Sequence, residues 1–257
     1  MNKNEYNSDE MKKKIQAMRE GGAILGRLLA DLKEYVKPGM TGKEVDAWVR
    51  AEIVKRGAGV AYDMLEEPFP GAICISVNDA LVHGAPTDEP FEEGDKVSFD
   101  LDIYYKGYFT DSAFTMMVGS KGSPAVKKMI SVTESSMWEG IEQVKPGAHI
   151  GDIGAAVEKV LRAGHLGVIE NYIGHGIGKE MHEEPEVPNY GKKGHGYVLR
   201  PGDTICIEPM SCLGKPANYV DVDSNWTVRM KDGSIGCHCE HTVLVTEDGY
   251  EVLTLAK

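Results

Sequence analysis

The chain has 257 residues, of which 42% are hydrophobic and 26% charged, a composition typical of soluble globular proteins. Its 28 basic and 40 acidic side chains leave a net charge of −12, which disfavours nucleic acid or an anionic membrane as a direct partner. The N-terminus has no apolar core of a secretory signal, and no run is long enough to span a membrane. We therefore expect a cytoplasmic protein, with residues 1–8 flexible.

Apolar spacing predicts a first helix from Met11 to Val36, with Gly21-Gly22 as a point of interruption. The capping-box signature at Thr41 to Glu44 predicts a second helix that ends at Lys55. Patterns further along predict a buried strand (72–77), a hairpin (96–105 with 108–118), helices (124–144 and 150–163) and strands (204–207, 226–230 and 236–246).

One internal repeat organises these elements. Val36-Lys37-Pro38-Gly39 recurs as Val144-Lys145-Pro146-Gly147, an offset of 108 residues. Chance recurrence of Pro-Gly turns is the alternative. Asp100 and Glu208 occupy the same strand position in the two copies, which favours a true repeat. We expect a single catalytic domain built from two halves, about 10–120 and 121–257.

Carboxylates share one face of the first hairpin. If Lys106-Gly107 forms a two-residue turn, Asp102 faces Asp111, and Asp100 lies diagonal to Asp111 at roughly 7–8 Å. Like charges at this separation repel each other, and a bound cation would compensate them. A solvated surface is the alternative for any one of these side chains.

The second copy supplies a matching pair of carboxylates. Glu208 ends the strand 204–207, and Glu240 lies where the first copy has Asp111. Four carboxylates at one centre neutralise about four positive charges, which means two divalent ions with bridging carboxylates. With one imidazole added, this oxygen-rich set suits Mn, Fe, Co or Zn.

The five cysteines form no Cys-x-x-Cys pair, which is typical of reduced cytosolic thiols. Cys237-His238-Cys239 admits two interpretations. It is either a small metal knuckle or a strand in which both sulfurs lie on one face in the core. The strand is favoured.

Five segments of the sequence, in their order and spacing, resemble type I methionine aminopeptidases, and the resemblance covers nearly the whole chain. The resemblance rests on NDALVHGAP (78–86), the Asp100/Asp111 hairpin, GHGIGKEMHEEP (174–185), TICIEPM (204–210) and CEHTVLVTEDG (239–249). It implies an α/β (α+β) pita-bread fold, in which two halves of helices and a β-hairpin surround a curved, largely antiparallel sheet about a pseudo-twofold axis.

The resemblance also implies an activity. The chain would be a hydrolase that removes the initiator methionine from nascent polypeptides with a small second residue, through a hydroxide that bridges two divalent ions. His83 and His182 would contact the substrate, and Glu208 would also shuttle a proton. The partners would be polypeptide N-termini, with the ribosome as a place of encounter, and the protein a monomer. The implied metal ligands are Asp100, Asp111, His175, Glu208 and Glu240.

Four residues resemble the lining of the family's methionine pocket: Phe69, Cys74, Met181 and Trp226. The chain departs from the family pattern nearby, because Glu66-Glu67-Pro68 replaces a common Tyr-x-Gly. One aromatic wall is therefore missing or comes from elsewhere, such as Tyr62. His238 stands where glutamine is usual, on the same strand face as Glu240, where it would perturb the metals or add a ligand.

The glycines of GHGIGKEMHEEP disfavour a helix, although His175 and His182 are two helical turns apart. We predict an extended backbone in which His175 binds metal and His182 addresses the substrate carbonyl. Two other functions remain open. An Xaa-Pro aminopeptidase or prolidase of the same fold would usually carry an extra N-terminal domain, and a non-catalytic binding protein would be expected to lack a ligand.

Overall fold

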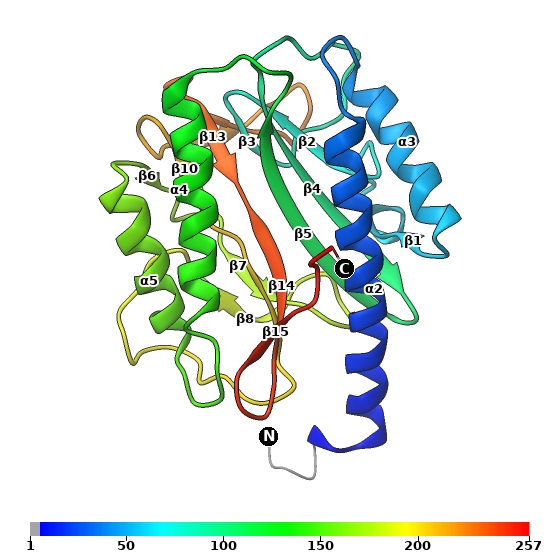
Figure 1. Cartoon of the computed structure of the whole chain (residues 1–257), viewed down its shortest axis with the longest axis vertical. Coiled ribbons are helices and arrows are strands. Elements are labelled where there is room, and N and C mark those ends of the chain that lie inside the picture. Colours follow the sequence, from blue (N-terminus) through cyan, green and yellow to red (C-terminus); the bar gives the residue numbers. More distant parts are fainter. Residues whose placement is uncertain (1–5, 257) are drawn as a thin grey trace.

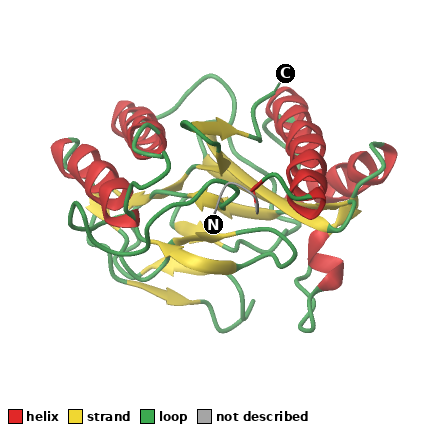
Figure 2. Cartoon of the chain, turned by 90° about the horizontal axis from the view of Figure 1, so that it is seen from below, coloured by secondary structure: helices red, strands yellow, loops and turns green. Residues whose placement is uncertain are grey.

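The computed structural model describes residues 6–256, in which four α-helices lie on one side of a curved sheet (Figures 1 and 2). Along these residues no helix is long and apolar enough to cross a membrane. The helices are α2 (Asp9–Tyr35), α3 (Gly42–Lys55), α4 (Pro124–Ile141) and α5 (Ile150–Ala163), and a short 3-10 helix, η1, covers Ala61–Met64.

The main sheet is antiparallel and runs in the order β1-β4-β5-β14-β9-β7-β8, with β2 beside β4 and β15 beside β14. Its strands are β1 (Gly59–Val60), β2 (Cys74–Val77), β4 (Lys96–Tyr105), β5 (Tyr108–Met117), β7 (Gly174–Gly176), β8 (Glu183–Val187), β9 (Thr204–Ile207), β14 (Glu240–Val245) and β15 (Tyr250–Val252).

Two smaller antiparallel sheets flank the main sheet, in the orders β13-β10-β6 and β11-β12-β3. Their strands are β3 (Ala80–Val82), β6 (Gly167–Val168), β10 (Met210–Cys212), β11 (Asn218–Val220), β12 (Val228–Met230) and β13 (Gly236–His238).

The first helix is continuous, so the interruption predicted at Gly21-Gly22 is wrong. Both glycines are buried in α2, and a Cβ on Gly22 would lie 2.5 Å from the carbonyl oxygen of Leu253. The helix therefore keeps its regular geometry. Because Gly22 has no Cβ, the helix can lie close to the C-terminal segment at Leu253. Ser8 accepts a hydrogen bond from the Met11 amide as the N-cap. Of the residues expected to be flexible, 1–5 lie outside the described part of the chain.

The predicted hairpin register is confirmed residue by residue. Tyr105 pairs with Tyr108, Asp102 with Asp111 and Asp100 with Ala113. The alternate residues of β4 point to the helix side and join the core beneath α2 and α3, namely Val97, Phe99, Leu101 and Ile103. The carboxylates consequently face the other side of the sheet, away from the helices.

The 108-residue offset recurs in the structure. Helices α3 and α5 are related by this offset at both ends, as are the short strands β1 and β6. Each helix begins with the same cap, because the Thr41 amide donates to Glu44 and the His149 amide donates to Asp152, both at 2.8 Å. The two copies therefore share local geometry as well as sequence.

The predicted strand 236–246 is divided in two. His238 pairs with Met210 in β10, whereas the chain beyond Cys239 pairs with β5 and β9 in the main sheet. Cys237 and Cys239 are buried in one hydrophobic cluster, as the strand interpretation predicted. Other predicted boundaries shift by one to three residues; for example, β2 begins at Cys74, α4 ends at Ile141 and β12 begins at Val228.

A fully buried lysine braces the segment that leads to His83. Lys96 is 0% exposed, and its Nζ donates to the carbonyls of Ser76 and Ala80 at 3.0 and 2.9 Å. These carbonyls flank the turn between β2 and β3. Burial lowers the pKa of Lys96 to about 8, because an ammonium is poorly solvated there.

Gly22→Ala should destabilise the protein by about 2 kcal/mol, since overpacking against a backbone carbonyl outweighs the gain in helix propensity. Gly21→Ala is the matched control, because its Cβ would approach nothing closer than 3.3 Å. Urea denaturation of the two variants measures the difference. Equal stabilities would contradict the close approach of α2 to Leu253.

When the pH is raised from 7 to 10, the free energy of unfolding of the wild type should increase by about 2 kcal/mol relative to that of Lys96→Met. The folded pKa of about 8 lies below the unfolded value, so the unfolded chain binds more protons across this window. Folded-state stability therefore rises as Lys96 loses its proton. Urea midpoints of both proteins at several pH values test this, and a pH-independent difference would refute it.

Candidate metal centre and substrate cavity

Three adjacent strands bring carboxylates together on the face of the sheet opposite the helices. Asp100 and Glu240 both pair with Ala113, from either side of β5. Asp111 lies two residues before Ala113 on the same face. Its position relative to β14 is fixed by Thr242, whose hydroxyl accepts from the Asp111 amide and donates to the Asp111 carbonyl.

Glu208 and His175 complete the group from the other half of the chain. Glu208 follows β9 directly, and His175 lies in β7 beside it. His175 Nε2 is 3.5 Å from Glu208 Oε1 and 3.9 Å from Asp111 Oδ2. The five ligands implied by the resemblance are thus brought together, with two from the first half and three from the second.

The segment GHGIGKEMHEEP is extended, as predicted. Gly174 and Gly176 lie in β7, where a Cβ on either would lie about 2.3 Å or less from a carbonyl oxygen of β9 or β8. The glycines therefore let β7 fit between its neighbours. His175 Nδ1 donates to the Gly176 carbonyl at 2.9 Å, which leaves Nε2 as the acceptor facing the carboxylates.

The electrostatics of the group favour a bound cation. Burial raises the pKa of Asp100, Asp111, Glu208 and Glu240 well above the ordinary carboxyl range, and repulsion by neighbouring carboxylates adds to it at all but Glu208. Burial lowers the pKa of His175 to about 3, so its ring is neutral. Asp100 Oδ1, Asp111 Oδ1 and Glu240 Oε1 are buried without a hydrogen-bond partner among the described residues.

The donor set fits divalent transition metals. Ligand atoms within 4.8 Å of one another form three groups among residues 6–256. One joins Asp111, His175 and Glu240, and carboxylate oxygen with neutral imidazole nitrogen is the donor chemistry of Mn, Fe, Co and Zn. The groups also include three residues outside the implied ligand set: Asp102, Cys206 and His238.

Strand alternation predicted all three on the carboxylate faces, but it assigned no role to Cys206. Strand alternation places Cys206 on the same face as Glu208, which was its only signal in the sequence. Its thiol is 3.7 Å from the hydroxyl of Thr242, and burial raises its pKa well above the usual value. Cys206 is fully buried in the hydrophobic cluster that also contains Phe69 and Met181.

The two remaining histidines flank the group. His182 is exposed, and its ring centroid lies 4.4 Å from that of His175. His83 has a left-handed backbone with φ 55° and its ring packs edge-on against Tyr172. Burial lowers the pKa of His83 to about 4, so it is neutral near pH 7. Both side chains line the same cavity as the carboxylates.

This cavity has a volume of about 270 Å³, with an aromatic end and an acidic end. Phe69, Cys74, Met181 and Trp226 all line it, as the resemblance implied. Tyr62 forms a further wall: its ring lies 5.0 Å from that of Phe69, and its hydroxyl is 3.3 Å from the Cys74 sulfur. The aromatic wall thus comes from η1, while the exposed Glu66 and Glu67 lie at the rim.

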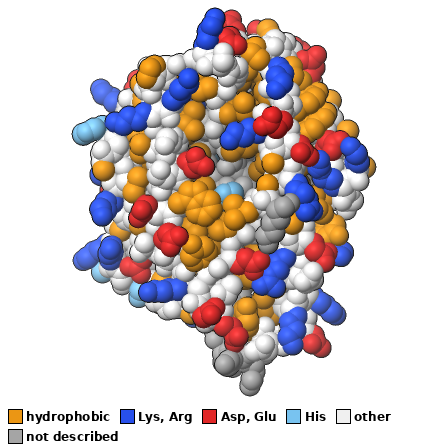
Figure 3. All heavy atoms as spheres, in the orientation of Figure 1, with side chains coloured by type: hydrophobic (Ala, Val, Ile, Leu, Met, Phe, Trp, Pro, Cys, Tyr) orange, Lys and Arg blue, Asp and Glu red, His pale blue; other side chains and the backbone are white. Residues whose placement is uncertain are grey.

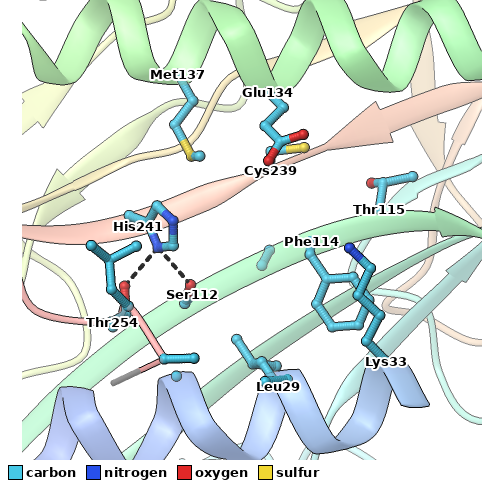
Figure 4. A pocket seen from close by; sticks show the side chains of 15 residues that line it. Leu29, Lys33, Ser112, Phe114, Thr115, Glu134, Met137, Cys239, His241 and Thr254 are labelled. Carbon is cyan, nitrogen blue, oxygen red and sulfur yellow. Dashed lines mark hydrogen bonds between the residues drawn. The ribbon is translucent and has the colours of Figure 1, made fainter. Parts of the chain in front are cut away.

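A second cavity, of about 190 Å³, lies on the helix side between α2 and α4. Hydrophobic side chains gather in the middle of this face, among scattered charges of both signs (Figure 3). His241 Nδ1 is hydrogen-bonded to the hydroxyls of Ser112 and Thr254 there (Figure 4). The Ser112 hydroxyl also donates to the Glu240 carbonyl at 2.7 Å, so this side holds the Glu240 backbone in place.

Comparisons with known proteins agree with this geometry. The model of metallopeptidase family M24 matches residues 16–247. Methionine aminopeptidase 1 of Bacillus subtilis is 38% identical over 243 residues, covering 94% of this chain and 96% of that protein.

Solved structures match as well. Methionine aminopeptidase from Rickettsia prowazekii has a TM-score of 0.91 at 34% identity, covering 95% of this chain and 97% of its own. A prolidase from Pyrococcus furiosus has a TM-score of 0.74 at 25% identity, covering 96% of this chain but 65% of its own. The predicted pita-bread fold is therefore confirmed, and the chain belongs to metallopeptidase family M24.

Proposed function

We propose that this protein is a metalloaminopeptidase that removes the initiator methionine from polypeptides with a small second residue. The observation that carries the proposal is the convergence of four carboxylates and one imidazole at one end of an aromatic-walled cavity. Curated relatives that are 36–40% identical to this chain are named methionine aminopeptidases, which supports this activity. The prolidase is a more distant match, with 25% identity.

In this proposal Asp100, Asp111, His175, Glu208 and Glu240 hold two divalent ions, drawn from Co, Mn, Fe and Zn. Such ions lower the pKa of bound water toward neutrality and polarise a carbonyl. Both halves, about 10–120 and 121–257, supply ligands, so they act as one catalytic domain.

The other polar side chains act on the substrate. His182 donates a hydrogen bond to the oxygen of the scissile carbonyl, where negative charge develops. His83 contacts the scissile amide and assists the leaving group. Glu208 accepts and returns a proton besides holding metal.

The aromatic end of the cavity binds the methionine side chain. A polarisable thioether packs favourably against the rings of Phe69, Trp226 and Tyr62 and the sulfur atoms of Cys74 and Met181. At the acidic end the free α-amine would be bound by a metal that these carboxylates hold, which confines cleavage to the first peptide bond.

The cellular setting follows from this activity. We place the protein in the cytoplasm as a monomer that meets nascent polypeptide N-termini, with the ribosome as a place of encounter. The net charge of −12 supports recognition of the polypeptide rather than of ribosomal RNA.

After chelation and reloading with Mn, Fe, Co or Zn, the protein should release methionine from Met-Ala-Ser and leave Ala-Pro peptides intact. Glu240→Ala should lower the rate roughly a hundredfold or more, because it removes a metal ligand. Glu247→Ala, an exposed position just beyond β14, is the matched control and should keep full activity. Cleavage of Ala-Pro alone, or full activity of Glu240→Ala, would overturn the proposal.

Metal should also stabilise the fold. At a metal concentration 100 times the dissociation constant, binding contributes about 2.7 kcal/mol, which corresponds to a rise in Tm of roughly 5 °C or more. Asp111→Asn should raise the Tm of the chelated protein, because it removes one of the repelling charges, and should reduce the gain on adding metal. Thermal denaturation of both proteins measures this. A chelated Asp111→Asn less stable than the chelated wild type would contradict the repulsion.

A further inference from the structure

His238 lies against the carboxylate group with both ring nitrogens unpartnered. Its side chain is 2% exposed, and neither Nδ1 nor Nε2 has a hydrogen-bond partner among the described residues. A buried polar group left without a hydrogen-bond partner destabilises the folded state. Both ring nitrogens of His238 are therefore available to a ligand, since no described protein group pairs with them.

The backbone orients the His238 ring toward the carboxylate group. His238 pairs with Met210 in β10, and its carbonyl accepts from the Thr115 hydroxyl at 2.5 Å. Since Cys239 points to the opposite, helix-side core, His238 and Glu240 share the acidic face. The ring also lines a cavity of about 500 Å³ with Asp100 and His175.

The distances are those of ligands around one ion. His238 Nε2 is 3.3 Å from Glu208 Oε2 and 3.8 Å from Glu240 Oε2. Both distances exceed the usual range of an N–H···O hydrogen bond. Two donor atoms about 2.1 Å from the same ion, at angles of about 90–130°, lie roughly 3.0–3.8 Å apart. His175 Nε2 is likewise 3.5 Å from the other oxygen of Glu208.

We propose that His238 Nε2 is a sixth protein ligand of the metal centre, beside Glu208 and Glu240. This inference rests on the metal centre of the proposed function. A second imidazole makes the donor set softer and richer in nitrogen. The centre then favours Zn and Co over Mn more strongly than four carboxylates and one imidazole would.

A purely positioning role makes a different prediction. If His238 only donated a hydrogen bond to Glu208, glutamine would replace it as a donor, and His238→Gln would bind metal as the wild type does. If His238 is a ligand, glutamine removes a nitrogen donor. Zinc affinity should then fall at least about tenfold, with a smaller loss for Mn.

Two measurements on the purified, chelated and reloaded protein decide this. Competition with a chromophoric chelator gives the affinities for Zn and Mn. X-ray absorption of the zinc form counts imidazole rings by their multiple scattering. The wild type should show two imidazoles per centre and His238→Gln one. A wild-type spectrum with a single imidazole per centre would overturn the inference, whether or not the variant folds.

Matched variants separate this inference from the proposed function. His83→Gln removes another imidazole from the same cavity and should leave zinc affinity and the imidazole count unchanged. Glu240→Ala should lose zinc affinity. If Glu240→Ala binds zinc normally, the metal centre itself is misassigned. If only His238→Gln binds normally, the centre stands and the sixth ligand is wrong.

Discussion

Mutual repulsion among carboxylates buried on one face of the sheet governs this molecule. Asp100, Asp111, Glu208 and Glu240 are each at most 9% exposed, and burial opposes their ionisation. No neighbouring lysine or arginine forms an ion pair with them among the described residues. The carboxylates stay close together because the opposite face of the same strands packs into the apolar core under the helices. Hydrophobic burial thus supports an electrostatically unfavourable arrangement that a cation would relieve.

The placement of the helices determines where substrate can enter. The four described α-helices cover the same side of the main sheet (Figure 2), which leaves the acidic face for a cavity. The repeated helix and cap geometry gives both halves the same way of presenting a carboxylate. Each half contributes carboxylates to the group, and the second half adds His175. The centre consequently exists only when β5, β9 and β14 are assembled side by side.

The two histidines of GHGIGKEMHEEP show how one short segment can serve two tasks. Gly174 and Gly176 let β7 fit closely between β8 and β9, which fixes His175 beside Glu208. The chain then turns, and His182 returns to within 4.4 Å of His175, between ring centroids, on the exposed side. One imidazole faces the acidic group while the other remains accessible to a ligand in the cavity.

Much of the architecture could be predicted from local patterns. Strand alternation and the Lys106-Gly107 turn were sufficient for the register that pairs Asp102 with Asp111, because a two-residue turn leaves one pairing. The capping box defined the start of α3. The implied ligands and pocket residues came from motif resemblance, and the structure brings all of them to one cavity.

Other features were decided only by tertiary structure. Gly21-Gly22 looks like a helix break, but packing against Leu253 turns it into a contact. The division at Cys239 and the approach of His238 Nε2 to Glu208 also depend on residues that are far apart in the chain. Local periodicity reports which face a side chain occupies. It carries no information on which distant element lies opposite, because that depends on how the cores of both halves pack together.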